Sequence, residues 1–127
     1  MNRRMEELTK SELLVMKTIW ESEDPLSLGE ITERVNRCYK KQWKEQTVST
    51  FLRNIIAKGY LKMYRHSRTY LYDPLVEEKF YEQQELLKFL NFWNDGRVDR
   101  LFASLTEVQK LTKEEKEHIK ELLDGME

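Results

Sequence analysis

Cysteine, proline and glycine are scarce in this sequence, whose 127 residues include one cysteine, two prolines and four glycines. The lone thiol, Cys38, excludes an internal disulfide and suggests a reducing, cytoplasmic compartment. So few glycines and prolines argue against a loop-rich fold. No apolar run approaches the roughly 18 residues of a membrane span, and none follows residues 1–5. We therefore expect neither membrane insertion nor a signal peptide.

Charge is abundant and unevenly distributed. Charged residues make up 35% of the chain and hydrophobic residues 39%, which is typical of a soluble helical protein. The net charge is only −1, yet residues 34–68 carry ten Lys and Arg against the single acid Glu45, a net of +9. Residues 74–127 carry a net of −5. The basic segment has the charge density of a phosphate-binding surface, although basic loops are also common as solvated surface.

Apolar residues at helical spacing predict three helices, over residues 10–22, 28–40 and 45–58. Thr9 with Glu12, and Ser27 with Glu30, have the spacing of capping boxes at the first two helix starts. Gly59 is a typical stop for the third. The inward stripe of this third helix is Val48, Phe51, Leu52, Ile55 and Ile56. Its outward face, Gln46, Ser49, Thr50, Arg53 and Asn54, is polar and contains no acid.

A β-hairpin is expected next, with strands over 60–64 and 69–72 and a tip at 65–68. Further helices are predicted over 75–93 and 97–108, with a turn at 94–96 between them. Thr112 and Glu115 form a capping box for a last helix. The chain is thus predicted to be mostly α with a small β-hairpin. We expect a winged helix-turn-helix domain over residues 1–74 and a helical domain over 75–127.

The order of three helices and a hairpin, with cations in the hairpin, is typical of a winged-helix DNA-binding domain. A helix that enters the major groove needs donors and acceptors without negative charge, which the third helix offers. The hairpin, which forms the wing of such a domain, needs groups that bind phosphate. The predicted DNA-binding residues are Lys40, Lys41, Lys44, Gln46, Thr47, Ser49, Thr50, Arg53, Arg65, His66, Ser67, Arg68 and Thr69.

The C-terminal helices hold more large apolar residues than about fifty positions can bury alone. A second copy of the chain would cover them by two-fold symmetry, so we expect a homodimer. The alternative is that this segment folds back onto the winged helix of the same chain. The predicted dimerisation residues are Leu86, Phe89, Leu90, Phe92, Trp93, Leu101, Phe102, Leu105, Leu122 and Leu123.

Several motifs resemble the penicillinase-repressor family, which includes the BlaI, MecI and CopY proteins. These are Glu12 with Val15-Met16 and Ile19-Trp20, the segment 47–52, Lys58-Gly59-Tyr60-Leu61, and the strand 68–72. The resemblance covers nearly the whole chain. It implies a homodimeric bacterial repressor that binds a palindromic operator of double-stranded DNA, with Thr47, Ser49, Thr50 and Arg53 on the recognition helix and residues 65–69 on the wing.

The resemblance also implies, as a further partner, a membrane sensor-protease acting on the C-terminal domain. The sequence departs from the family at three points. Ser104-Leu105 stands where the antibiotic-responsive members have the Asn-Phe bond that is cleaved, so cleavage control stays open for this chain. No cysteine follows Cys38, which argues against the copper sensing of the Cys-x-Cys branch. Lys44-Glu45 stands where many members have Ser-Pro before the recognition helix. The operator and the inducing signal are not encoded in any motif that we identify.

Two other functions remain open at this stage. The winged helix could bind another protein, although such a module does not need the basic segment. The C-terminal helices could also enclose a small ligand, as in other winged-helix regulators. No arrangement typical of an enzyme is present, and His66 and His118 lack the partners of a metal site. We therefore expect no catalysis, cofactor or metal.

Overall fold

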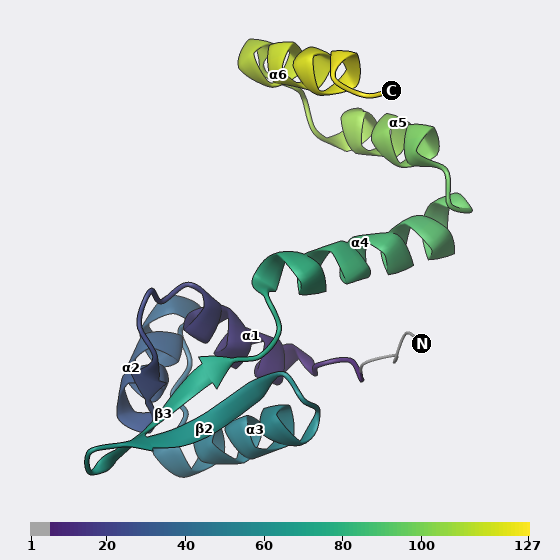
Figure 1. Ribbon diagram of the computed structural model, residues 1–127. Coiled ribbons are helices and arrows are strands. Elements are labelled where there is room, and N and C mark those ends of the chain that lie inside the picture. Colours follow the sequence, from purple (N-terminus) through teal and green to yellow (C-terminus); the bar gives the residue numbers. More distant parts are fainter. Residues whose placement is uncertain (1–5) are drawn as a thin grey trace. The chain divides into compact units, whose positions relative to one another are not determined.

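The computed structural model describes residues 6–127, and it forms two compact units that divide between Tyr81 and Glu82 (Figure 1). Residues 1–5, on which the expected absence of a signal peptide depends, lie outside the described residues. The first unit contains α1 (Lys10–Trp20), α2 (Leu28–Tyr39), α3 (Glu45–Ala57) and a small sheet. The mostly helical fold with a hairpin is as predicted.

The helix starts are set by local hydrogen bonds. Thr9 and Glu12 form a reciprocal capping box at α1, and Ser27 and Glu30 form another at α2, as predicted. The predicted end of α1 was two residues too far, because the backbone N–H of Glu21 bonds both Ile19 and Lys17 and tightens the last turn. Gly59, with φ 89°, follows the end of α3 in the left-handed conformation that glycine favours.

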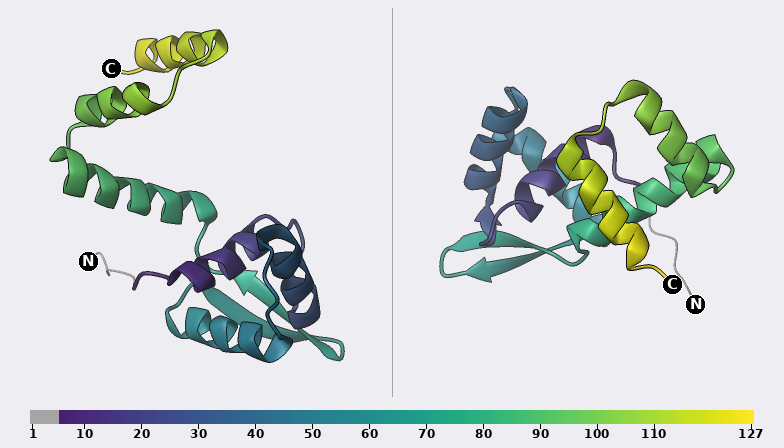
Figure 2. Two further views of the ribbon diagram at one scale, coloured as in Figure 1. Left: turned by 180° about the vertical axis from the view of Figure 1, so that it is seen from behind. Right: turned by 90° about the horizontal axis from the view of Figure 1, so that it is seen from above.

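The hairpin is longer, and its turn tighter, than predicted. Strand β2 (Leu61–His66) pairs antiparallel with β3 (Thr69–Pro74), so the turn is only Ser67-Arg68. Arg65 and His66 therefore belong to β2 rather than to the tip. The physical reason is Ser67, whose φ of 59° permits a two-residue hairpin turn. Figures 1 and 2 show the turn projecting beyond the helices of its unit.

A third strand, β1 (Leu26–Ser27), was not predicted. It pairs with β3 through Leu26 opposite Tyr72 and Ser27 opposite Leu71, giving the order β1-β3-β2. Two residues are too few to show strand periodicity. Through this strand, the segment between α1 and α2 pairs with β3 of the hairpin.

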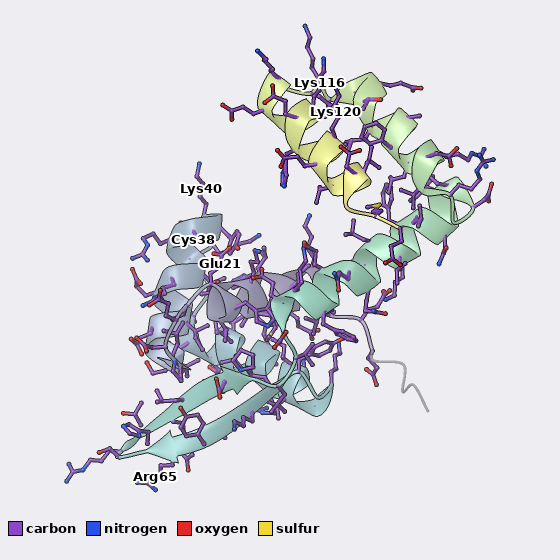
Figure 3. The ribbon with its side chains drawn as sticks, turned by 45° about the horizontal axis from the view of Figure 1, so that its top comes forward. Glu21, Cys38, Lys40, Arg65, Lys116 and Lys120 are labelled. Atoms are coloured by element: carbon purple, nitrogen blue, oxygen red, sulfur yellow. The ribbon has the colours of Figure 1, made fainter. Side chains whose placement is uncertain are left out.

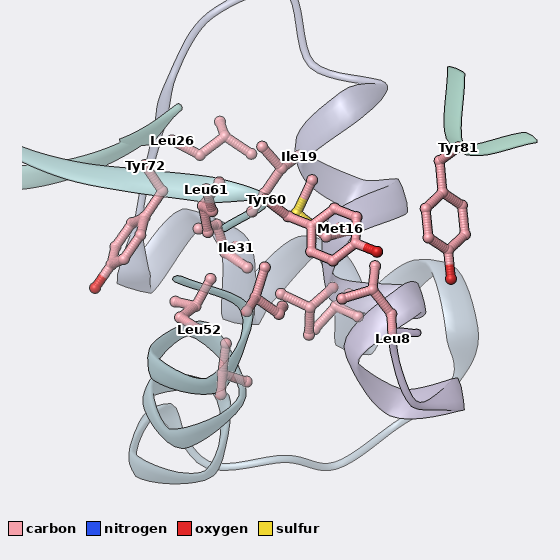
Figure 4. Packing of buried hydrophobic residues seen from close by; sticks show 14 residues of the cluster. Leu8, Met16, Ile19, Leu26, Ile31, Leu52, Tyr60, Leu61, Tyr72 and Tyr81 are labelled. Atoms are coloured by element: carbon pink, nitrogen blue, oxygen red, sulfur yellow. The ribbon is translucent and has the colours of Figure 1, made fainter. Parts of the chain in front are cut away.

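The core of the first unit lies between the three helices and the sheet (Figure 4). Its fully buried side chains are Val15, Met16, Leu26, Ile31, Val35, Val48, Leu52, Ile55 and Leu61. The predicted inward stripe of α3 is thus buried at Val48, Leu52 and Ile55, while Phe51 and Ile56 are half-buried against the same core. This packing holds one side of α3 inward and leaves the other in solvent.

The remaining helices are α4 (Glu78–Asn94), α5 (Val98–Val108) and α6 (Lys113–Asp124). α4 begins three residues later than predicted, since Leu75 and Val76 bond to the first unit instead of entering the helix. Asp95 and Gly96, both with positive φ, form the predicted turn after α4, and Thr112 with Glu115 forms the predicted capping box of α6. Within residues 6–127, no helix is long and apolar enough to cross a membrane.

Candidate nucleic-acid interface

The exposed face of α3 carries most of the predicted base-reading side chains. Gln46, Thr47, Thr50 and Arg53 are exposed, and Ser49 is half-buried. The Thr50 hydroxyl donates to the carbonyl of Gln46, four residues earlier in the helix, at 3.1 Å. Spacings of three and four residues place these groups on one side of the helix. The face therefore presents amide, hydroxyl and guanidinium groups together.

The segment before α3 is fixed by Asn36 and Trp43, two residues that sequence reasoning missed. Asn36 Nδ2 donates to the carbonyl of Trp43 at 2.9 Å, and Asn36 Oδ1 accepts from its N–H at 3.0 Å. The Trp43 ring packs edge-on against Phe51, with 5.0 Å between centroids. A lone tryptophan inside a polar loop was the available signal. Together these contacts hold the loop between α2 and α3.

Cations of the predicted set lie along this loop. Lys41 Nζ is 5.6 Å from the centre of the Trp43 ring. Lys44 is the N-cap of α3 and, within residues 6–127, makes no side-chain cap hydrogen bond. Figure 3 places Lys40, at the end of α2, far from Arg65 of the hairpin. The structure thus gathers Lys41 and Lys44 at the start of α3 and sets Lys40 apart from the wing.

The hairpin side chains alternate between two faces. Arg65 lies opposite Tyr70 and His66 opposite Thr69, so adjacent residues of β2 point to opposite sides. The Arg65 guanidinium is 6.0 Å from the Tyr70 ring centre, and its Nε donates to the Ser67 carbonyl at 3.2 Å. Residues 65–70 are all exposed. One face of the wing thus offers Arg65 and the other His66, with Ser67 and Arg68 at the turn.

Arg53 links the helix and the sheet electrostatically. Burial raises the pKa of the Tyr72 phenol, while the positive charge of Arg53 lowers it, and burial prevails. Tyr72 lies in β3, opposite Met63 of β2. Arg53, an exposed residue of α3, is thus the cation whose charge opposes the effect of burial on the pKa of Tyr72.

The second unit leaves most of its apolar side chains in solvent. Of residues 82–127, only Asn94 is buried. Phe92 is 75% exposed and Trp93 67%, and their rings contact each other edge-on at 4.8 Å. In the predicted dimerisation set, Leu90 and Leu101 are half-buried, and the exposed members are Leu86, Phe89, Phe92, Trp93, Phe102, Leu105, Leu122 and Leu123. Leu87, Val98, Val108 and Met126 are similarly exposed and were not in that set.

The part of the chain from residue 6 to 127 contains no group of three or more His, Cys, Asp or Glu side chains that could hold a metal ion. Its chemistry is that of hydrogen-bonding and cationic groups on a helix and a wing.

The chain is similar to known repressors over nearly its full length. A family model described as penicillinase repressor matches residues 8–125. The chain is 25% identical over 122 residues to the penicillinase repressor of Bacillus licheniformis, covering 96% of this chain and 93% of that protein. It is 24% identical over 124 residues to the methicillin resistance regulatory protein MecI of Staphylococcus aureus, covering 98% of each.

Two solved structures resemble the winged-helix part. The solution structure of the DNA-binding domain of the repressor BlaI matches with a TM-score of 0.51 and 26% identity, over 61% of this chain and 90% of that one. The solution structure of monomeric Bacillus licheniformis BlaI in complex with the blaP half-operator matches with a TM-score of 0.50 and 26% identity, over 60% of this chain and 89% of that one. These matches confirm the predicted fold and the family resemblance.

Proposed function

The chain belongs to the penicillinase repressor family and is a transcriptional repressor, and we propose that it acts as a homodimer on a palindromic DNA operator. The observation that carries this proposal is the exposed polar face of α3 beside a cationic hairpin, within a segment whose net charge is +9. Its structural relative BlaI has been solved in complex with a half-operator. A bacterial operator as the ligand implies a cytoplasmic location.

In this proposal α3 enters the major groove. Arg53 suits the bidentate contact to guanine and Gln46 the contact to adenine. Ser49 and Thr50 donate or accept single hydrogen bonds, and the methyl group of the exposed Thr50 can contact the thymine methyl. Thr47 lies in the same turn. These side chains select the sequence of each half-site.

Phosphate contacts position the helix. Lys41 and Lys44 lie just before α3, where backbone N–H groups at a helix start add to the attraction for anions. The proposed wing contacts are Arg65, His66, Ser67, Arg68 and Thr69. Lys40 contributes charge from the end of α2.

The second unit supplies the dimer in this proposal. Exposed apolar side chains on all three of its helices need a partner of similar chemistry, and a second copy offers an identical surface. Two winged helices related by two-fold symmetry then match the two arms of a palindrome.

Control by a membrane sensor-protease acting on the C-terminal domain would require cleavage at a position where this chain has Ser104-Leu105. Ser104 and Leu105 lie inside α5, so a protease would have to unwind that helix to reach the bond between them. We expect the chain to stay full length when cells are exposed to a β-lactam. Immunoblotting before and after exposure tests this, and a shortened chain would establish proteolytic control.

The DNA-binding proposal is tested by duplex affinity as a function of salt concentration. Arg53→Ala combined with Arg68→Ala should weaken binding and make its salt dependence shallower, by about 0.9 in slope for each phosphate that the variant no longer neutralises. Lys116→Ala combined with Lys120→Ala removes the same charge from exposed positions of α6 (Figure 3) and should change neither. Absence of wild-type binding at low salt would refute the proposal.

A further inference from the structure

The segment that connects the winged helix to α4 is bonded to the first unit at several points. Trp20 Nε1 donates to the carbonyl of Val76 at 2.8 Å. The N–H of Leu75 donates to the carbonyl of Tyr60 at 2.8 Å. Lys17 forms an ion pair with Glu78 in the first turn of α4. The sequence of this segment, Pro74 to Tyr81, also contains no glycine or serine, the residues of flexible linkers.

Tyr81, in the first turn of α4, completes this attachment. Its side chain is 8% exposed, and its ring lies 5.7 Å from the rings of both Trp20 and Tyr60. Figure 4 shows Tyr81 alongside the core residues. The first unit therefore includes the start of α4, and the boundary between the two units falls within this helix.

We propose that Trp20, Val76, Glu78 and Tyr81, here called the α4 root, are positioning residues that determine which half-site spacing the repressor accepts. This inference rests on the proposed function of a dimer that binds a palindrome. The α4 root holds the first turn of the helix through which each winged helix is connected to its dimerising unit. A stiff connection gives a high effective concentration for one spacing, whereas a flexible connection tolerates several.

Two substitutions loosen the root without emptying the core. Trp20→Phe keeps an aromatic ring beside Tyr81 but removes the N–H that bonds Val76. Glu78→Ala removes the ion pair with Lys17, at a side chain that is 37% exposed. The matched control is Glu21→Ala, because Glu21 is the other partner of Lys17, at 3.5 Å, and lies outside α4.

Three duplexes serve as probes: a palindrome selected with the wild-type chain from a random library, the same palindrome with about five base pairs inserted between its arms, and one arm alone. The insertion is about half a helical turn. The wild type should prefer the uninserted palindrome by roughly tenfold or more, and the Trp20→Phe, Glu78→Ala double variant by about threefold or less. Affinity for one arm should be the same for the wild type, the double variant and Glu21→Ala.

The outcomes separate the two proposals. A double variant that keeps the wild-type spacing preference overturns the role of the α4 root. The proposed repressor function is not affected by that result as long as the wild type binds one arm. Loss of one-arm binding by the double variant would show damage to the winged helix itself and also overturns the positioning role. A wild type that binds none of the duplexes refutes the proposed function.

Discussion

Asn36 of α2 holds Trp43 by its backbone, donating to the carbonyl at 2.9 Å and accepting from the N–H at 3.0 Å. These two bonds pair the backbone N–H and carbonyl of Trp43, which lies in the loop between α2 and α3. Their consequence is a fixed path for the loop that carries Lys41 and Lys44 to the start of α3.

Asn36→Ala should therefore destabilise the winged helix and misplace α3. Loss of both hydrogen bonds at a partly buried site should reduce the free energy of unfolding by about 1–3 kcal/mol. Urea denaturation followed by circular dichroism measures this change. Gln42→Ala, at an exposed position of the same loop, is the control and should have little effect. Equal stability of the two variants would contradict the role of Asn36.

The lowered pKa of Glu12 predicts a loss of stability in acid. Burial raises the pKa of its carboxyl. The hydrogen bonds from Lys58 and Thr9 and the charge of Lys58 lower this pKa by more than burial raises it, so the net shift is downward. A carboxyl with a lowered pKa stabilises the fold above its unfolded pKa of about 4.3. That stability is lost as the pH falls through the lower, folded value.

Glu12→Gln should accordingly be less stable than the wild type at neutral pH, by about 2 kcal/mol for the missing charge-assisted bonds. The difference should shrink as the pH falls below about 4.3. Glu33→Gln removes the exposed pair with Arg37 and should cost little at any pH. Denaturation midpoints at several pH values give the comparison. A pH-independent difference between Glu12→Gln and the wild type would be inconsistent with the ion pair between Glu12 and Lys58.

Trp93→Glu should dissociate the dimer. A carboxylate in an apolar interface would lose its hydration without a partner, whereas in a monomer the site is largely in solvent, with Trp93 67% exposed. Sedimentation equilibrium at micromolar concentration should give a dimer for the wild type and for Gln84→Glu, an exposed position of the same helix, and a monomer for Trp93→Glu. A monomeric wild type would refute the predicted homodimer.

The two lysines that flank the α2–α3 loop should differ in their effect on DNA affinity. Lys44→Ala removes a cation next to the first turn of α3 and should lower the salt slope by about one phosphate contact. Lys40→Gly removes a cation far from the wing, and glycine accepts the φ of 54° found there, so its effect should be smaller. Fluorescence anisotropy over a salt series makes the comparison. Equal slopes would place Lys40 in the interface as firmly as Lys44.

Local signals were enough to predict the helices of this chain. Thr9, Ser27 and Thr112 each begin a helix because the hydrogen bonds of a capping box join residues only three positions apart. The polar face of α3 was equally readable, since the spacing of its buried residues determines which side chains point outward. Contact of that face with DNA stays a prediction.

Features that depend on distant residues or unusual backbone were not readable. Ser67 adopts a positive φ without the Gly or Asn that usually marks such a turn, so the wing was predicted with too long a tip. The bond from Trp20 to Val76 spans 56 positions, and no local pattern announces it. For the same reason the packing of Tyr81 on Tyr60 could not be read from the sequence.

The central claim, that α3 reads base sequence, is tested most directly by selecting duplexes from a random library with the wild type and with Arg53→Ala. The wild type should select a palindromic consensus. The variant should select the same consensus with one relaxed position in each arm, at a cost of about 1–3 kcal/mol for the guanine contact. A wild type that selects no consensus, or a variant that keeps every preference, would contradict the assignment of α3 as the reader.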